Sequence, residues 1–466
     1  MLLSINTSAK TPLYIQIYQQ LKDKIHNNEL KTNEKLASKR QLATLNDVSE
    51  NTIMNAYNQL LTEGYIYAIE RKGYFVADVE LQFETPDITG EMEAESEEKK
   101  NTIRYDLTRS NPDVTLFPFS VFSKLYRNHF SQQEDALLKE SSGQGLDELR
   151  KALQHYLSQS RGVPCRKEQI ILGPSTEYLL SLLFQIVDTK PLIGLEDPGY
   201  PGFSHLLERF YLETQPVPVD EKGVDVAKLK DSDIDMMLVT SNHQFPTGTI
   251  MPLDRRQALL NWANESPDKY IIENDYDSEF KYSGIPIPSL KYLDQKKKVI
   301  HLGSFTRVLS PSIRMSYMVL PEPLLTQYKW KFPSHSSVLS TSEQWVITDF
   351  ITQGHFTTHL NRSRTFYKKK RDALMDTIYK LDPDAMIHGE NAGLHLLVSP
   401  SFHFDGVLFK ELALAEGIKL NVLSDYSTEA RPEYANVLFI SFSHLPKEDF
   451  ENVVEKLVEI AKKCEQ

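Results

Sequence analysis

Two short stretches of the chain put hydroxyl groups at the expected start of a helix, where they could bind a phosphate. In the first, Ser38, Lys39 and Arg40 combine a hydroxyl with two cations. In the second, Ser175 and Thr176 open an apolar helical segment. Free backbone N–H groups at a helix N-terminus favour a phosphate dianion, and hydroxyl and cationic side chains add to that attraction. Taken alone, the hydroxyls are equally explained as helix caps.

A polar helix face follows the first of these stretches. Ser49 is a good N-cap residue, and the segment after it places Asn51, Thr52 and Asn55 on one side. A carboxamide can pair bidentately with adenine N6 and N7, so such a helix suits the major groove of DNA. For any single one of these residues, a solvated helix surface is the simpler explanation.

Two β-prone runs, residues 65–69 and 74–76, flank a tip that carries Arg71 and Lys72. This pattern predicts a β-hairpin, and its basic tip could reach the minor groove or the flanking DNA backbone. A helix, a turn, a capped helix and a basic-tipped hairpin in this order are typical of a winged helix-turn-helix. The ordered set is harder to dismiss than any one residue.

Apolar spacing predicts the three helices that position these groups. The first helix has an apolar face made of Tyr14, Ile17, Tyr18, Leu21 and Ile25. The second follows Ser38 and is expected to bury Leu42, Ala43 and Leu45. The third has a stripe made of Ile53, Ala56, Tyr57, Leu60 and Leu61, and Gly64 ends it.

A change of composition divides the chain. Residues 90–100 contain five acids in eleven positions and no aliphatic pattern, which is typical of a solvated linker. Beyond it, short apolar runs alternate with helix-period segments, which predicts an α/β domain with a mostly parallel sheet. We expect a DNA-binding domain over residues 1–79, a linker over 80–105 and a second domain over 106–466, with a smaller C-terminal subdomain from about residue 345.

The composition excludes several classes of protein. With 466 residues, of which 40% are hydrophobic and 25% charged, the chain is expected to be globular. The sequence contains no run of 18 apolar residues, so it predicts no membrane span. Its N-terminus does not resemble a secretion signal. Two cysteines are too few for a disulfide framework or a cysteine-rich zinc site. We expect a cytoplasmic protein. The net charge of −12 does not argue against DNA binding, because residues 1–80 hold nine basic and nine acidic residues.

Residues 11–77 resemble the GntR family of bacterial regulators. The segment from Glu34 to Ala43 is similar to the family's "LPSxRxLA" motif, with Ala37 in place of the proline, and the resemblance continues from Thr52 to Gly64 and from Gly73 to Val76. The resemblance implies a domain that binds double-stranded operator DNA and works as a dimer.

Residues 106–466 resemble fold-type I, pyridoxal-phosphate-dependent aminotransferases. The segments that carry the resemblance are 143–146, 173–177, 196–200, 243–248, 273–280 and 303–307. A GntR-like domain fused to this fold is the architecture of the MocR/GabR-type transcription regulators. The resemblance therefore implies a homodimer whose second domain senses a small effector.

The same resemblance implies roles for individual residues. Ser175, Thr176, Ser304 and Arg314 match phosphate ligands, and the arginine adds a bidentate fork. Tyr200 matches the aromatic residue that stacks on the pyridine ring, and Tyr276 matches the tyrosine that hydrogen-bonds the ring hydroxyl.

Two departures from the family pattern bear on catalysis. Arg307 occupies the position that the family's Schiff-base lysine would have. A guanidinium stays protonated and cannot form an imine. Asn274 occupies the position of the family's acid that partners the pyridine nitrogen. Asp275 is adjacent, so a shift of the alignment by one residue would restore a carboxylate there. The lysines at 296–298 precede the strand expected over 299–302 and stand at its wrong end.

These observations predict a transcription regulator that is not an enzyme and that holds pyridoxal phosphate non-covalently, or a related phosphorylated or amino compound. Binding of an amino acid has less support, because the strand over 436–442 lacks the arginine that usually holds a substrate carboxylate, and Arg431 is the nearest candidate. Two alternatives remain open: an active aminotransferase with a DNA-binding appendage, and a regulator whose second domain is a ligand-free dimerisation scaffold.

Overall fold

A computed structural model describes the chain except for residues 7–10, 79–102, 133, 283–287, 430 and 465–466. It divides into two compact units, Met1–Glu98 and Lys99–Gln466, and each is described here by itself. The predicted linker over 80–105 lies almost wholly outside the described residues. Tyr105, at its predicted end, pairs with Ile418 of the second unit.

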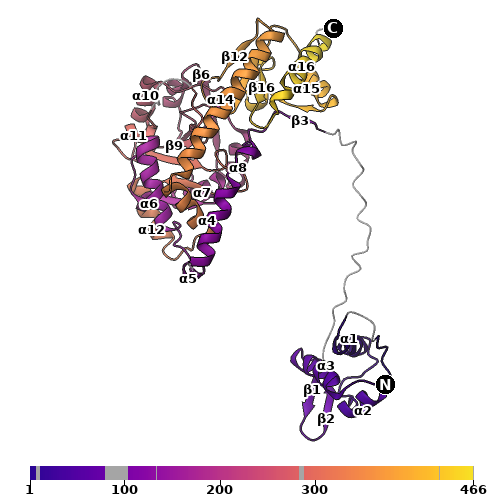
Figure 1. The fold of residues 1–466 in the computed structure, drawn as a ribbon. Helices are drawn as coiled ribbons and strands as arrows, with labels where there is room; N and C mark the ends of the chain where they lie inside the picture. Colours follow the sequence, from indigo (N-terminus) through magenta and orange to yellow (C-terminus); the bar gives the residue numbers. More distant parts are fainter. Residues whose placement is uncertain (7–10, 79–102, 133, 283–287, 430, 465–466) are drawn as a thin grey trace. The chain divides into compact units, whose positions relative to one another are not determined.

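The first unit contains three helices followed by an antiparallel hairpin (Figure 1). Its elements are α1 (Leu13–His26), α2 (Lys39–Leu45), α3 (Glu50–Thr62), β1 (Ile66–Ile69) and β2 (Gly73–Val76). The predicted winged helix-turn-helix is confirmed in order and in type.

Side-chain caps fix where the second and third helices begin. The Gln41 N–H donates to Ser38 Oγ at 3.2 Å, and the Ser38 N–H donates back to Gln41 Oε1 at 3.1 Å. The Thr52 N–H donates to Ser49 Oγ at 3.1 Å. Such caps satisfy N–H groups that the helix leaves unpaired. Each cap stabilises the folded protein by about 0.5–2 kcal/mol.

The core of the first unit follows the predicted stripes, with one exception. Ile17, Leu21, Ile53 and Leu60 are fully buried, but Leu45 is 51% exposed. Leu42 and Ala43 set the buried direction of α2, and at 100° per residue Leu45 points about 110° away from the midpoint of that pair. The expectation that Leu45 faces inward is wrong.

The second unit is built on an eight-stranded sheet with the order β4-β11-β10-β9-β8-β5-β6-β7. Neighbours from β10 to β6 run parallel, whereas β11 and β7 run antiparallel to their neighbours. The strands are β4 (Ile170–Gly173), β5 (Ile193–Asp197), β6 (Thr214–Asp220), β7 (Gly223–Val224), β8 (Met236–Val239), β9 (Tyr270–Asp275), β10 (Val299–Ser304) and β11 (Ser316–Val319).

Both faces of this sheet are buried, which explains its continuous apolar runs. In β8, Leu238 belongs to the cluster formed with helices α7, α8 and α12, whereas Met237 belongs to the cluster formed with α9, α10 and α11. Successive side chains of a strand alternate between the faces. These helices are α7 (Thr176–Ile186), α8 (Pro201–Arg209), α9 (Val226–Lys230), α10 (Leu253–Ala263), α11 (Leu290–Leu293) and α12 (Glu322–Lys331).

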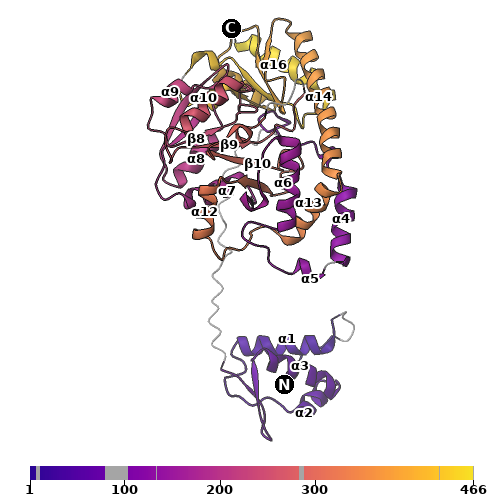
Figure 2. The same cartoon turned by 90° about the vertical axis from the view of Figure 1, so that its left-hand side faces the viewer.

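The remaining elements include a four-stranded antiparallel sheet, β12-β13-β16-β15, and the pair β14-β3. The long helix α14 runs along the unit from α13 towards α16 (Figure 2). The bounds are α4 (Phe119–Gln132), α5 (Glu134–Leu137), α6 (Asp147–Tyr156), α13 (Thr341–Thr352), α14 (His355–Leu381), α15 (Gly406–Ala415), α16 (Phe450–Cys464), β3 (Tyr105–Asp106), β12 (Met386–His388), β13 (His395–Ser399), β14 (Ile418–Lys419), β15 (Asn421–Val422) and β16 (Leu438–Ser441). The predicted subdomain start near residue 345 falls inside α13. Of the described helices, none has the length and apolar character needed to cross a bilayer.

Candidate functional site

One cavity of about 210 Å³ in the second unit is lined by all eight residues for which the sequence predicted contact with a cofactor. These residues are Ser175, Thr176, Tyr200, Asn274, Tyr276, Ser304, Arg307 and Arg314. They are spread over 140 positions of the chain, so only the fold brings them together.

The sheet explains this convergence. Strands β5, β9 and β10 are parallel, so their carboxyl ends meet at one edge, and the N-terminus of α7 lies at the same cavity. In open α/β sheets, ligands bind at this edge. The segment between β10 and β11 adds Arg307 and Arg314.

Hydroxyl groups and a cation cluster at one part of the cavity. Ser175 Oγ caps α7 by accepting the Tyr178 N–H at 3.2 Å. Ser304 Oγ lies 3.0 Å from Thr306 Oγ1 and 3.0 Å from Ser316 Oγ. The exposed Arg314 side chain has no hydrogen-bond or ion-pair partner in the described part of the chain. Polar hydrogens, a helix N-terminus and an uncompensated cation favour a phosphate group.

Arg307 lies against Tyr276. Its guanidinium carbon is 5.4 Å from the centre of that ring, and Nη1 donates to the Ser110 carbonyl at 3.4 Å. Among the described residues no carboxylate lies within 4 Å of it. No lysine is among the described residues that line the cavity. The amine of Lys298 is occupied elsewhere, because it donates to the carbonyls of Ser266 and Pro267.

Alternation along β9 separates Asn274 from Asp275. Asn274 lines the cavity, whereas Asp275 is turned to the other face and forms an ion pair with the buried Arg161. Burial raises the pKa of Asp275, but the charges of Arg161 and His301 and the hydrogen bonds from Ser278 and Arg161 together outweigh burial and hold this pKa below its ordinary value. A shift of one residue would therefore place the carboxylate outside the cavity.

The groups expected to bind DNA lie on exposed parts of the first unit. Arg40, Asn51, Asn55, Arg71 and Lys72 are exposed, and within the described residues their side chains have no hydrogen-bond or ion-pair partner. The other four residues expected to bind DNA do have partners within the first unit. Ser38, Ser49 and Thr52 take part in the helix caps, and the Lys39 amine lies 5.7 Å from the centre of the Tyr74 ring.

Comparison with known proteins identifies both units. Residues 13–76 match the family of bacterial regulatory proteins, gntR family, and residues 121–457 match aminotransferase class I and II. The uncharacterized HTH-type transcriptional regulator YdeL of Bacillus subtilis is 36% identical over 97% of both chains. The chain belongs to the HTH-type transcriptional regulators that carry an aminotransferase class I and II domain.

Other relatives of this regulator have more specific names. The probable rhizopine catabolism regulatory protein MocR of Rhizobium meliloti is 28% identical and covers 94% of this chain and 92% of its own. The pyridoxine biosynthesis regulator PdxR of Corynebacterium glutamicum is 29% identical over 91% of both chains. A multiple substrate aminotransferase from Thermococcus profundus has the same fold as the second unit, with a TM-score of 0.68 and 23% identity over 78% of this chain and 92% of its own.

Three polar residues that pack behind the lining residues Tyr276 and Phe245 were not predicted from the sequence. His243 Nδ1 lies 2.9 Å from the Tyr276 hydroxyl and 2.9 Å from Asp277 Oδ2. Burial, followed by the Asp277 charge, raises the pKa of Tyr276 well above its ordinary value, so its hydroxyl stays protonated. His395, buried beside His243, has its pKa lowered well below the ordinary value by burial and by the neighbouring positive groups. The segments 243–248 and 273–280, which carry His243 and Asp277, resemble the family, but the resemblance alone assigns these two residues no role.

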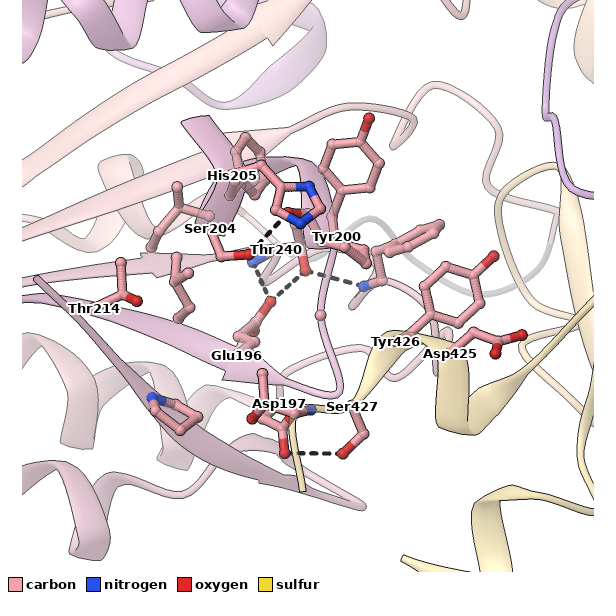
Figure 3. A pocket seen from close by; sticks show the side chains of 18 residues that line it. Glu196, Asp197, Tyr200, Ser204, His205, Thr214, Thr240, Asp425, Tyr426 and Ser427 are labelled. Atoms are coloured by element: carbon pink, nitrogen blue, oxygen red, sulfur yellow. Dashed lines mark hydrogen bonds between the residues drawn. The ribbon is translucent and has the colours of Figure 1, made fainter. Parts of the chain in front are cut away.

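A second cavity of about 240 Å³ shares Tyr200, Phe203, Thr240 and Phe245 with the first. Figure 3 shows the side chains that line this second cavity. The buried Glu196 side chain accepts hydrogen bonds from the Thr240 backbone and hydroxyl at 3.0 and 2.6 Å. Thr240 Oγ1 in turn accepts the Phe245 N–H at 3.0 Å. Glu196 therefore holds the loop that forms the wall between the cavities. Burial raises its pKa to about 7.

Arg431, the nearest candidate for a substrate carboxylate, is already engaged. Its Nη1 donates to the Tyr434 hydroxyl at 2.8 Å, and Nη2 lies 3.3 Å from Glu429 Oε2 and 3.6 Å from Asp197 Oδ2. It does not line the cavity that contains Arg307.

Proposed function

We propose that this chain is a cytoplasmic, homodimeric transcription regulator whose second unit binds pyridoxal phosphate or a related phosphorylated or amino compound non-covalently. The observation that carries the proposal is a single cavity that combines phosphate-binding groups, an aromatic residue and two arginines, with no lysine among its described lining residues. Operator DNA would be bound by the first unit.

The residues present fit the phosphate and the ring of pyridoxal phosphate. Ser175, Thr176, Ser304 and Arg314 would hold the phosphate, and Tyr276 would donate a hydrogen bond to the ring oxygen. Tyr200, which also lines the cavity, would cover the ring. When it is bound to an aminotransferase, this cofactor supplies an aldehyde for imine formation and a ring that withdraws electrons.

The same residues do not fit transamination. Arg307 cannot form an imine, and the neutral amide of Asn274 does not keep a pyridine nitrogen protonated. Loss of both groups agrees with the relatives being named as regulators. Ligand binding would then act by favouring one arrangement of the dimer over another, which requires a different affinity for the two arrangements.

Calorimetric titration of the full-length protein with pyridoxal phosphate tests the proposal. We expect reversible binding, and treatment with borohydride should leave no phosphopyridoxyl group on any peptide. Arg314→Ala should weaken binding, because the phosphate loses a charged partner. No heat of binding would favour the ligand-free scaffold. A reduced lysine adduct, together with turnover of amino donors, would favour the active aminotransferase.

A further inference from the structure

Within the described part of the chain, Arg307 and Arg314 have few of their guanidinium N–H groups satisfied, unlike the buried Arg161 and Arg256 of the second unit. Arg161 pairs with Asp275 and Glu279, and Arg256 donates to the carbonyls of Met251, Pro288 and Ser241. Arg307, by contrast, makes one long hydrogen bond to a carbonyl, although a guanidinium has five N–H donors. A site that places two uncompensated guanidinium groups around one cavity favours a ligand with two anionic groups.

Both arginines lie in the segment that joins Ser304 to Ser316, and both line the cavity. Arg314 stands two residues before Ser316, whose hydroxyl belongs to the hydroxyl cluster. Arg307 lies against the Tyr276 ring. Glu177, at the α7 N-terminus, is the one acid among the described lining residues. Within the described residues, neither Glu177 nor any other acid forms an ion pair with Arg307.

A guanidinium and an amine make different demands on a ligand. A lysine at this position would form a covalent bond to an aldehyde, whereas a planar fork of N–H donors matches the two oxygens of a carboxylate. We infer that the ligand of this cavity is a phosphorylated aromatic carboxylate, whose phosphate is held near Arg314 and whose carboxylate is held by Arg307. This inference rests on the proposed function and specifies the chemical class of its ligand.

Two analogues of pyridoxal phosphate test the inference, one with the aldehyde oxidised to a carboxylate and one with it reduced to an alcohol. Neither can form an imine, so the comparison isolates the charge. In titrations of the full-length protein we expect the carboxylate to bind at least about tenfold more tightly than the alcohol, as for a hydrogen-bonded charge pair.

Matched variants assign that preference to one residue. Arg307→Gln should abolish the preference while it leaves the affinity for the alcohol within about threefold, because the alcohol has no anionic group for the guanidinium to pair with. Arg307→Lys, which keeps the charge without the fork, should retain part of the preference. Arg314→Gln should weaken both analogues by the same factor. Thermal melts of each variant would show whether it is folded.

The outcomes separate this inference from the proposed function. Equal binding of both analogues to the wild-type protein would overturn the inference and leave the proposed function intact, and this comparison needs no variant. A preference that persists in folded Arg307→Gln would also overturn it. Binding of neither analogue, nor of pyridoxal phosphate, would overturn the proposed function and the inference together.

Discussion

Arg307 is the residue on which the proposed loss of covalent chemistry chiefly depends. It occupies the same cavity as the phosphate-binding groups, and its charge lies beside His395, whose pKa is already lowered by burial. Because His395 is neutral, it adds no second positive charge that could attract an anion away from Arg307. Under the proposed function, this one side chain would separate a cavity that binds its ligand non-covalently from one that could form an imine.

Arg307→Lys should restore covalent attachment of pyridoxal phosphate, because a primary amine is the missing group. We expect a yellow protein with one borohydride-reducible adduct at the substituted position, found by peptide mapping. Turnover should stay negligible until Asn274→Asp is added, since the amide leaves the pyridine nitrogen unprotonated. The two effects should be non-additive. A colourless Arg307→Lys protein would mean that the cavity does not hold the cofactor, and full activity without Asn274→Asp would contradict the role of Asn274.

Glu196 predicts a pH dependence of stability. Its pKa is raised from 4.5 in the unfolded chain to about 7 by burial, so the folded protein binds this proton more tightly. The stabilisation is complete below pH 4.5 and is lost as the pH rises to about 7. Glu196→Gln keeps an acceptor for Thr240 but cannot ionise. Thermal melts should show the variant gaining stability relative to wild type between pH 5 and pH 8, and a constant difference would contradict the raised pKa.

At the scale of elements, we expect α2 and α3 to make different contacts with DNA. Ser38 and Ser49 fix the helix starts through their caps, which places Arg40 at one helix N-terminus and Asn55 on an exposed face. The hairpin β1-β2 presents Arg71 in a left-handed conformation at its tip, with φ 61°. Local hydrogen bonds thus orient groups that themselves remain free for DNA.

Arg40→Ala and Asn55→Ala should separate phosphate contact from base reading. Arg40→Ala should weaken binding to operator and non-specific duplexes alike and reduce the slope of affinity against salt, because a phosphate contact is lost. Asn51→Ala and Asn55→Ala should cost about 1–3 kcal/mol mainly at the operator. Fluorescence anisotropy with both duplexes at several salt concentrations measures both effects. Thr44→Ala, at another exposed position of α2, serves as a control.

At the scale of the whole molecule, charge is distributed unevenly between the parts of the chain. Residues 1–80 are neutral in sum, so the net charge of −12 lies entirely in residues 81–466. An acidic surface repels the DNA backbone, which leaves the first unit as the part suited to bind it.

A chain truncated to residues 106–466 should therefore lose DNA binding altogether and keep its affinity for pyridoxal phosphate. Anisotropy with operator DNA and calorimetry with the ligand measure the two properties separately, and light scattering would show whether the truncated chain is still a dimer. DNA binding by the truncated chain would contradict the assignment of the first unit, whereas loss of ligand binding alone would indicate that the cavity needs the first unit.

Much of this protein was determined by local sequence alone. Caps such as Ser49, the apolar stripes of α1 and α3, and the turn between β1 and β2 depend on neighbours within a few residues, so their order and type could be predicted. Leu45 shows the limit of that reasoning, because a short helix buries only the side chains that face its neighbours in space, and Leu45 faces away from them. The eight cavity residues were named from resemblance to a family, and not from spacing.

The tertiary structure decided what the sequence left open. Asn274 and Asp275 are adjacent in sequence, and only the alternation of β9 within its sheet determines which of them faces the cavity and which meets Arg161. The contacts of Arg307 with Ser110 and Tyr276, the engagement of Arg431 and the cluster around His243 depend on residues far apart in the chain. Such contacts are set by packing of the sheet and its helices, which no local pattern encodes.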